Sequence, residues 1–246
     1  MTAHTIDPYE AAVRHLTASD PRMAALITRV GPCRMRGPAV AAAVPLQALP
    51  SEGSAPHYEE DHFAGLVYAI VGQQLSPSAA RTIFGRVRDL ALHPSGRLDP
   101  ALLLGLSEAR LREAGLSGAK TRAVHDLAAR VQSGALALET LETGADAEIV
   151  ASLCEVRGIG RWTAEMFLIF RLGRLDILPV GDLGVQKGFV KLFSLRKLPT
   201  PERMEKLARP FRPYRSVACW YLWRLNEEKP APTEDAGAKS APRPRR

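Results

Sequence analysis

Cysteine is scarce in this sequence of 246 residues, and its three cysteines lie far apart, at Cys33, Cys154 and Cys219. An odd number with no close pair excludes a zinc knuckle or a four-cysteine iron–sulfur cluster. It also disfavours a secreted disulfide framework. The cysteine pattern therefore favours an intracellular protein.

Long apolar runs are also missing. The most apolar stretch, AVAAAVPL, is short and is broken by Pro45, so we expect no membrane span. The first residues, MTAHTIDPYE, show no basic segment followed by an apolar run, and no signal peptide is expected. These absences predict a cytoplasmic protein without a membrane partner, associated with the nucleoid if its source is bacterial.

Alternating patterns of Val and Ile are absent as well, which argues against strands. Ala, Leu and Arg dominate instead, and apolar residues recur at helical spacing. One such face is formed by Phe63, Leu66, Val67 and Ile70. No internal repeat indicates a solenoid. We therefore predict an all-α fold.

The formal net charge is +7 and the isoelectric point is about 9.6. Residues 227–246 hold five Lys or Arg and four Asp or Glu, so most of the positive charge belongs to the rest of the chain. A basic body favours a polyanionic partner, nucleic acid first, although a merely soluble basic protein has the same net charge. Residues 227–246 lack large apolar side chains and are predicted to be a disordered tail.

The segment VRGIG, residues 156–160, lies between two predicted helices. Its two glycines permit positive φ angles and a tight reversal, while Ile159 anchors the turn in the core. Backbone N–H groups at the turn and at the start of the next helix are then left unpaired, which suits a phosphate. Arg157 and Arg161 add positive charge. The alternative interpretation is an ordinary helical hairpin with a glycine cap.

Four segments carry a resemblance to a known family. LCEVRGIGRWTAEMFLIF followed by LPVGDLGVQKGF resembles the helix-hairpin-helix and Gly/Pro-Asp signature of the base-excision DNA glycosylases. AIVGQQLS resembles the helix-and-wedge segment of that family, and FRPYRSVACWYLWR resembles the last helix of its DNA-3-methyladenine glycosylase II, or alkylbase, branch. The matches run in the family's order from about residue 60 to 225. The resemblance implies a DNA-binding hairpin formed by Arg157, Gly158, Ile159, Gly160, Arg161 and Thr163.

Asp182 follows the extended segment ILPVG. On its own it reads as the N-cap of a helix that starts at Leu183, and the resemblance implies that it is also catalytic. Breaking an N-glycosidic bond builds positive charge on the sugar, which a fixed carboxylate stabilises while it orients or activates water. An alkylated purine already carries positive charge and leaves without strong protonation, so one acid can suffice.

Two tryptophans match aromatic positions of the base pocket in the alkylbase branch, Trp162 and Trp223. A cationic methylated base stacked on an indole gains about 0.5–2 kcal/mol. The alternative is a core aromatic, which we prefer for Trp220. Met166, one turn after Trp162, is a further candidate lining residue, although some relatives have an aromatic there. In bifunctional relatives a nucleophilic lysine occupies the position of Trp162, so the resemblance implies a monofunctional enzyme.

The resemblance also assigns a wedge and a cation. Gln74 matches the residue that fills the space left by an extruded base, with Leu75 beside it; the alternative is a polar helix terminus. No cofactor is required, but the hairpin of the family often holds a monovalent cation, K⁺ or Na⁺. Its carbonyl ligands would be those of Cys154, Val156 and Ile159.

A second candidate metal site is the segment HYEEDHF. It offers His57, Glu59, Glu60, Asp61 and His62 as ligands. Acidic residues at the start of a helix are the simpler explanation for this pattern.

Taken together, these features predict a monomer with two helical domains and a DNA-binding cleft between them. Residues 61–190 form the hairpin domain, and residues 1–60 with 191–226 form the second. The predicted activity is hydrolytic excision of alkylated purines, such as 3-methyladenine and 7-methylguanine, from damaged double-stranded DNA. Two alternatives remain: a glycosylase for uracil, mismatched thymine or adenine opposite an oxidised guanine, and a noncatalytic helix-hairpin-helix module in which Asp182 is only a cap.

Overall fold

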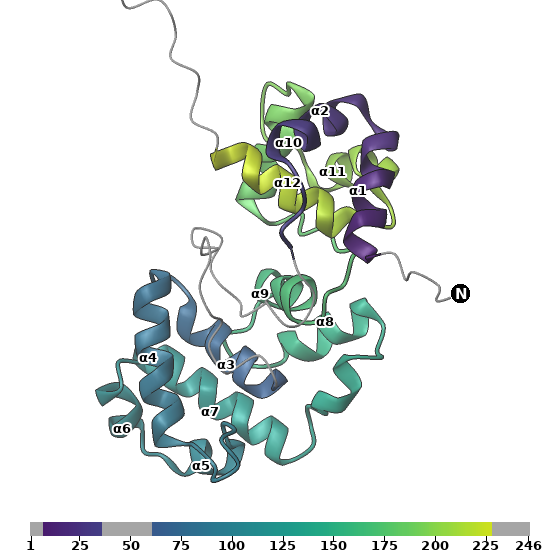
Figure 1. Cartoon of the computed structure of the whole chain (residues 1–246). Helices are drawn as coiled ribbons and strands as arrows, with labels where there is room; N and C mark the ends of the chain where they lie inside the picture. Colours follow the sequence, from purple (N-terminus) through teal and green to yellow (C-terminus); the bar gives the residue numbers. More distant parts are fainter. Residues whose placement is uncertain (1–6, 36–60, 228–246) are drawn as a thin grey trace, which may run out of the picture.

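A computed structural model describes residues 7–35 and 61–227 (Figure 1). Within these ranges the chain forms helices and no strand, which confirms the all-α prediction. None of these helices has both the length and the apolar character that crossing a membrane would need. The predicted tail beyond residue 227 lies outside the described residues, and so do His57, Glu59 and Glu60.

The helices form two lobes, one above the other in Figure 1. The lower lobe contains α3 (His62–Gly72), α4 (Pro77–Leu90), α5 (Pro100–Gly105), α6 (Glu108–Glu113), α7 (Gly118–Gln132), the 3-10 segment η1 (Leu138–Leu141), α8 (Asp146–Cys154), α9 (Arg161–Met166) and the π-helical segment η2 (Phe167–Arg171). The upper lobe contains α1 (Pro8–Ser19), α2 (Pro21–Val30), α10 (Leu183–Phe193), α11 (Pro201–Leu207), the 3-10 segment η3 (Arg209–Phe211) and α12 (Arg215–Glu227).

Helix starts follow the local chemistry of the sequence. Aspartate, serine or threonine side chains cap most of the helices, and proline occupies the first turn of α1, α2, α4, α5 and α11. The helix α3 differs from the predicted one-sided pattern, because every residue from Phe63 to Gly72 is buried. It packs against α4, α7 and η2, so it is the central helix of the lower lobe rather than an amphipathic surface helix.

The predicted domain boundary at residue 190 is wrong, because α10 packs against α12 and α2 in the upper lobe. Two glycines one turn apart allow this close packing. A Cβ atom on Gly188 would lie 2.6 Å from Cβ of Leu222, and one on Gly184 would lie 2.9 Å from Cδ1 of Trp223. The chain therefore passes between lobes after η2, in the segment that leads to Asp182.

Candidate active site

Asp182 is the N-cap of α10, as the local pattern predicted, and its carboxylate is also held by two indoles. Oδ1 accepts hydrogen bonds from the backbone N–H of Val185 (2.7 Å) and from Nε1 of Trp223 (2.9 Å). Oδ2 accepts one from Nε1 of Trp162 (2.7 Å). Trp162 belongs to α9 of the lower lobe and Trp223 to α12 of the upper lobe, so the buried carboxylate joins the two lobes.

The two tryptophans differ in exposure. Trp223 is 2% exposed and stacks on Phe170, with ring centroids 5.6 Å apart. Trp162 is 40% exposed. In this structure, therefore, only Trp162 of the pair offers an accessible ring face to a base, while Trp223 is a core aromatic that keeps its N–H for Asp182. Met166 is 5% exposed and belongs to the hydrophobic core, which favours packing over the predicted lining role.

A second carboxylate near Asp182 was missed from the sequence. Glu165 is buried on α9, and its Oε1 accepts a hydrogen bond from Nε of Arg161 at 2.8 Å. Burial raises the pKa of Glu165 and the negative charge of Asp182 raises it further, while Arg161 opposes both. An acid four residues after an arginine in an otherwise apolar stretch was the available signal, but that spacing is equally typical of an exposed helical ion pair.

The two glycines of the hairpin turn between α8 and α9 differ in backbone conformation and in the space around them. Gly158 has φ +79°, and a Cβ there would lie 3.1 Å from Cβ of Ala123. The backbone of Gly160 is extended, and an added Cβ would meet no described atom within 4 Å. The fold therefore requires glycine at 158 but not at 160. Ile159 is 3% exposed, which confirms that it anchors the turn.

Only part of the turn has free amides. The N–H of Arg157 donates to Oδ2 of Asp126 (2.7 Å), and that of Ile159 to the carbonyl of Val156 (3.0 Å). Among the described residues no acceptor pairs with the N–H groups of Gly158, Gly160 or Arg161, and no side chain caps α9. The expectation of unpaired amides is thus correct for Gly158 and for the start of α9, and wrong for Arg157 and Ile159.

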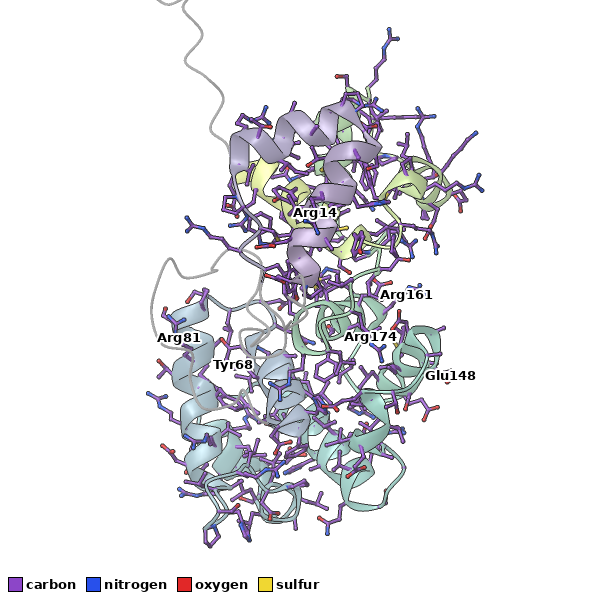
Figure 2. All side chains as sticks on the ribbon, turned by 45° about the vertical axis from the view of Figure 1, so that its right-hand side comes forward. Arg14, Tyr68, Arg81, Glu148, Arg161 and Arg174 are labelled. Carbon is purple, nitrogen blue, oxygen red and sulfur yellow. The ribbon has the colours of Figure 1, made fainter. Side chains whose placement is uncertain are left out.

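The charged and polar side chains of the hairpin also divide. Arg157 is exposed, and Arg161 is exposed although Glu165 holds it. Figure 2 shows Arg161 at the level where the two lobes meet. Thr163 is 8% exposed, so its side chain is too buried for the predicted DNA-binding role and only its backbone remains a candidate.

The predicted wedge residue Gln74 is exposed and follows α3 in a left-handed conformation with φ +58°. Leu75 beside it is half-buried and packs on the core. The preceding glutamine was not singled out from the sequence. Nε2 of Gln73 donates to the carbonyl of Gly158 at 2.9 Å and so links the wedge to the hairpin turn.

Of the three backbone carbonyls predicted to bind a cation, one has a backbone partner in the described part of the chain. The carbonyl of Val156 accepts the N–H of Ile159, and those of Cys154 and Ile159 accept no backbone N–H in the described part of the chain. The metal cluster at HYEEDHF is not supported where it can be seen. Asp61 caps α3 through the N–H of Phe63 (2.9 Å), His62 pairs with Glu142 (3.2 Å), and no described group of three or more ligands could hold a metal.

Comparison with known proteins identifies relatives of this chain. "Alkylbase DNA glycosidase-like protein mag2" of Schizosaccharomyces pombe is 30% identical over 218 residues, covering 88% of this chain and 93% of that protein. "DNA-3-methyladenine glycosylase 1" of the same organism is 32% identical over 171 residues, covering 69% and 74%.

Solved structures agree with these sequence matches. A DNA-3-methyladenine glycosidase from Bacillus halodurans superposes with a TM-score of 0.71 at 32% identity, covering 91% of this chain and 93% of that one. The family model described as "HhH-GPD superfamily base excision DNA repair protein" matches residues 67–213, more than half of the sequence. This chain therefore belongs to the HhH-GPD superfamily of base excision DNA repair proteins.

Proposed function

We propose that this protein is a monofunctional DNA glycosylase that excises alkylated purines from double-stranded DNA by hydrolysis of the N-glycosidic bond. The observation that carries the proposal is the Asp182 carboxylate, buried and oriented by three N–H donors, beside the half-exposed ring of Trp162. A fixed anion in a site with little water stabilises the positive charge that develops on the sugar. The accessible indole face offers a cationic base a stacking partner.

The relatives support this choice of substrate. Two of them are named as 3-methyladenine glycosylases or glycosidases, from S. pombe and B. halodurans. The S. pombe enzyme has also been solved "in complex with abasic-DNA", and it superposes on this chain with a TM-score of 0.68 at 29% identity. DNA is therefore the partner that the family supports, and alkylated duplex is the substrate that we propose.

The side chain at position 162 favours hydrolysis without a lyase step. The side chain of Trp162 lies 2.7 Å from Asp182, at the position where bifunctional relatives carry a nucleophilic lysine. An indole nitrogen has no basic lone pair and forms no Schiff base. We therefore propose that the abasic product is left uncut.

For the hairpin, we propose that it grips a DNA phosphate through the free amides at the start of α9, with Arg157 and Arg161 adding charge. Gln74 enters the base stack as the wedge. A monovalent cation, when bound by the carbonyls of Cys154, Val156 and Ile159, would add positive charge at the same place. The protein would act as a monomer.

Release of free bases from methylated duplex DNA, measured by chromatography for wild type and Asp182→Asn, tests the proposal. Asparagine keeps the helix cap, so the variant should bind DNA yet release methylpurines roughly 10³-fold more slowly. Asp99→Asn is the matched control, because Asp99 caps α5 in the same way, with Oδ1 accepting from the N–H groups of Ala101 (2.7 Å) and Leu102 (3.0 Å).

Each contrary result has a distinct meaning. Retained release by Asp182→Asn removes the catalytic assignment. Release of only uracil or a mismatched base from parallel duplexes changes the substrate, and no release from any duplex that is bound leaves a noncatalytic DNA-binding protein. A covalent DNA adduct trapped by borohydride contradicts the monofunctional assignment.

A further inference from the structure

The helix α7 contacts both segments that we propose to bind DNA, namely the end of α3 next to Gln74 and the hairpin turn between α8 and α9. Lys120, Ala123 and Asp126 follow each other at intervals of three residues, so they lie along one face of the helix. Lys120 contacts the end of α3 beside the wedge, and the other two contact the hairpin turn. We call these three residues the α7 stripe.

Lys120 holds the C-terminal end of α3. Its Nζ donates to the carbonyl oxygens of Val71 (2.7 Å) and Gln73 (2.6 Å), which lie at the end of the helix where carbonyls lack intrahelical partners. Burial lowers the pKa of Lys120, as expected for an ammonium group that has lost part of its water shell. The next residue after Gln73 is the exposed, left-handed Gln74, so the ammonium group fixes the backbone from which the wedge projects.

The other two residues of the α7 stripe hold the hairpin. A Cβ atom on Gly158 would lie 3.1 Å from Cβ of Ala123, so the turn lies directly on the helix. Oδ2 of Asp126 accepts the N–H of Arg157 at 2.7 Å. The residue before the wedge also contacts the hairpin directly, because Nε2 of Gln73 donates to the carbonyl of Gly158 at 2.9 Å. The three elements thus form a closed set of contacts.

We infer that the α7 stripe is a positioning device that sets the distance between Gln74 and the hairpin. Base extrusion requires the wedge to enter the stack at a fixed offset from the phosphate that the hairpin grips. A displacement of about 1 Å in such an arrangement can cost two orders of magnitude in rate. The inference rests on the proposed function for the DNA contacts, but it assigns Lys120 a role that acts through Gln74 and not on the reacting atoms.

The test is Lys120→Met, which keeps the length of the side chain and removes the ammonium group. Lys191→Met is the matched control, because Nζ of Lys191 donates to the carbonyl of Leu225 (3.0 Å) near the C-terminal end of α12, in the other lobe. Gln73→Ala is the second variant; it removes the direct link at a half-buried side chain, should Lys120→Met fold poorly. Fluorescence of 2-aminopurine beside a tetrahydrofuran abasic analogue in duplex DNA reports unstacking without requiring catalysis.

We expect Lys120→Met and Gln73→Ala to bind this duplex within a few-fold of wild type but to lose most of the fluorescence rise, while Lys191→Met behaves as wild type. Excision of a paired lesion should fall about 10-fold in the two variants, and excision of the same lesion in a mismatched, already unstacked context should fall far less. The Lys120→Met loss should also be non-additive with Gln74→Ala.

Equal losses on paired and unstacked lesions, or an equal loss in Lys191→Met, would show that Lys120 only stabilises the fold. Absence of unstacking by the wild type would overturn the wedge and this inference with it. Unstacking without excision of any base would instead refute the proposed function and leave the inference standing.

Discussion

Two glycine-containing turns open two helices on opposite sides of the lobe junction, and they satisfy their helix ends in opposite ways. The turn before α9 has no side-chain cap in the described residues, and amides at its end stay unpaired. The turn before α10 is capped by Asp182, which accepts the N–H of Val185 and two indole N–H groups. An uncapped helix start suits an anion from outside, whereas a capped one holds its own anion in place for chemistry.

One glycine at each helix start shows the same contrast: Gly160 is the N-cap residue of α9, and Gly184 lies in the first turn of α10. Gly160 faces open space, so the fold leaves room for a ligand to approach the backbone. Gly184 has no such space, because a Cβ there would lie 2.9 Å from Cδ1 of Trp223 and 3.0 Å from Oδ1 of Asp182. One glycine therefore serves an external contact and the other an internal one.

Apart from substitution of Asp182 itself, the largest effect is expected at the internal contact. Gly184→Ala should separate the indole of Trp223 from the Asp182 carboxylate, because the added Cβ would lie too close to both groups and at least one of them must shift. Excision per folded molecule, measured under single turnover, should fall by roughly 10²-fold or more, with a stability loss of about 1–3 kcal/mol from overpacking.

Gly188→Ala is the control for overpacking. A Cβ on Gly188 would lie 2.6 Å from Cβ of Leu222, which is also on α12, but Gly188 is one turn of α10 farther from the Asp182 carboxylate than Gly184. It should lower the melting temperature and largely spare the excision rate of the folded fraction. Similar rate losses in both variants would mean that helix spacing, and not contact with the carboxylate, explains the effect.

The tryptophans give a second prediction for the internal turn. Trp162→Phe and Trp223→Phe keep an aromatic ring and remove the N–H donor, so each should lower the excision rate constant about 10–100-fold, as expected for one hydrogen bond to a charged group. Trp220→Phe is the matched control, because Trp220 is buried on α12 and makes its ring contact with Tyr221 instead. Wild-type rates in both test variants would mean that the indoles act only through their rings.

The external turn should respond in binding and not in stability. Gly160→Asp places a negative charge where the phosphate is proposed to lie, and the unobstructed Cβ direction leaves the fold unstrained. Affinity for undamaged duplex should fall about 10-fold for any base sequence, as measured by fluorescence anisotropy at fixed salt. Gly158→Ala is the complementary variant: its positive φ and the contact with Ala123 predict a stability loss of about 1–2 kcal/mol. Unchanged affinity in Gly160→Asp would contradict the phosphate site.

Sequence reasoning predicted these two turns unequally well. The helix starts, the glycine turn and the cap at Asp182 follow from local chemistry, so they were accessible without a structure. The paired indole donors were not, because they depend on how α9 and α12 approach α10 in space. The boundary at residue 190 failed for the same reason: an amphipathic pattern shows that a helix has a partner but not which one. The glycines at 184 and 188, one turn apart, were the unused signal.

Lys120 and Glu165 were missed for a different physical reason. A single charged residue in a helix is usually solvated, and nothing in its immediate neighbours distinguishes one that donates to two carbonyls of another helix. Met166 shows the converse error, since helical spacing from Trp162 does not say which side of α9 is buried. Burial in this region depends on the arrangement of several helices, and that information is spread over the whole chain.

The smallest effect is expected at Glu165, which interacts with both turns. It accepts a hydrogen bond from Arg161, and the negative charge of Asp182 raises its pKa. Its pKa is raised above the ordinary value of 4.5, because burial and the negative charge of Asp182 disfavour the carboxylate more than Arg161 favours it. The stability that this acid contributes is therefore complete at low pH and is lost as the pH rises through the raised pKa. Glutamine at position 165 is neutral at every pH. The melting temperature of Glu165→Gln should therefore rise relative to that of the wild type as the pH is raised from about 4 to 8. If this difference in melting temperature shrank over the same range, the ion pair with Arg161 would outweigh the effect of burial. Glu165 would then hold Arg161 more firmly than an open phosphate site at the external turn requires.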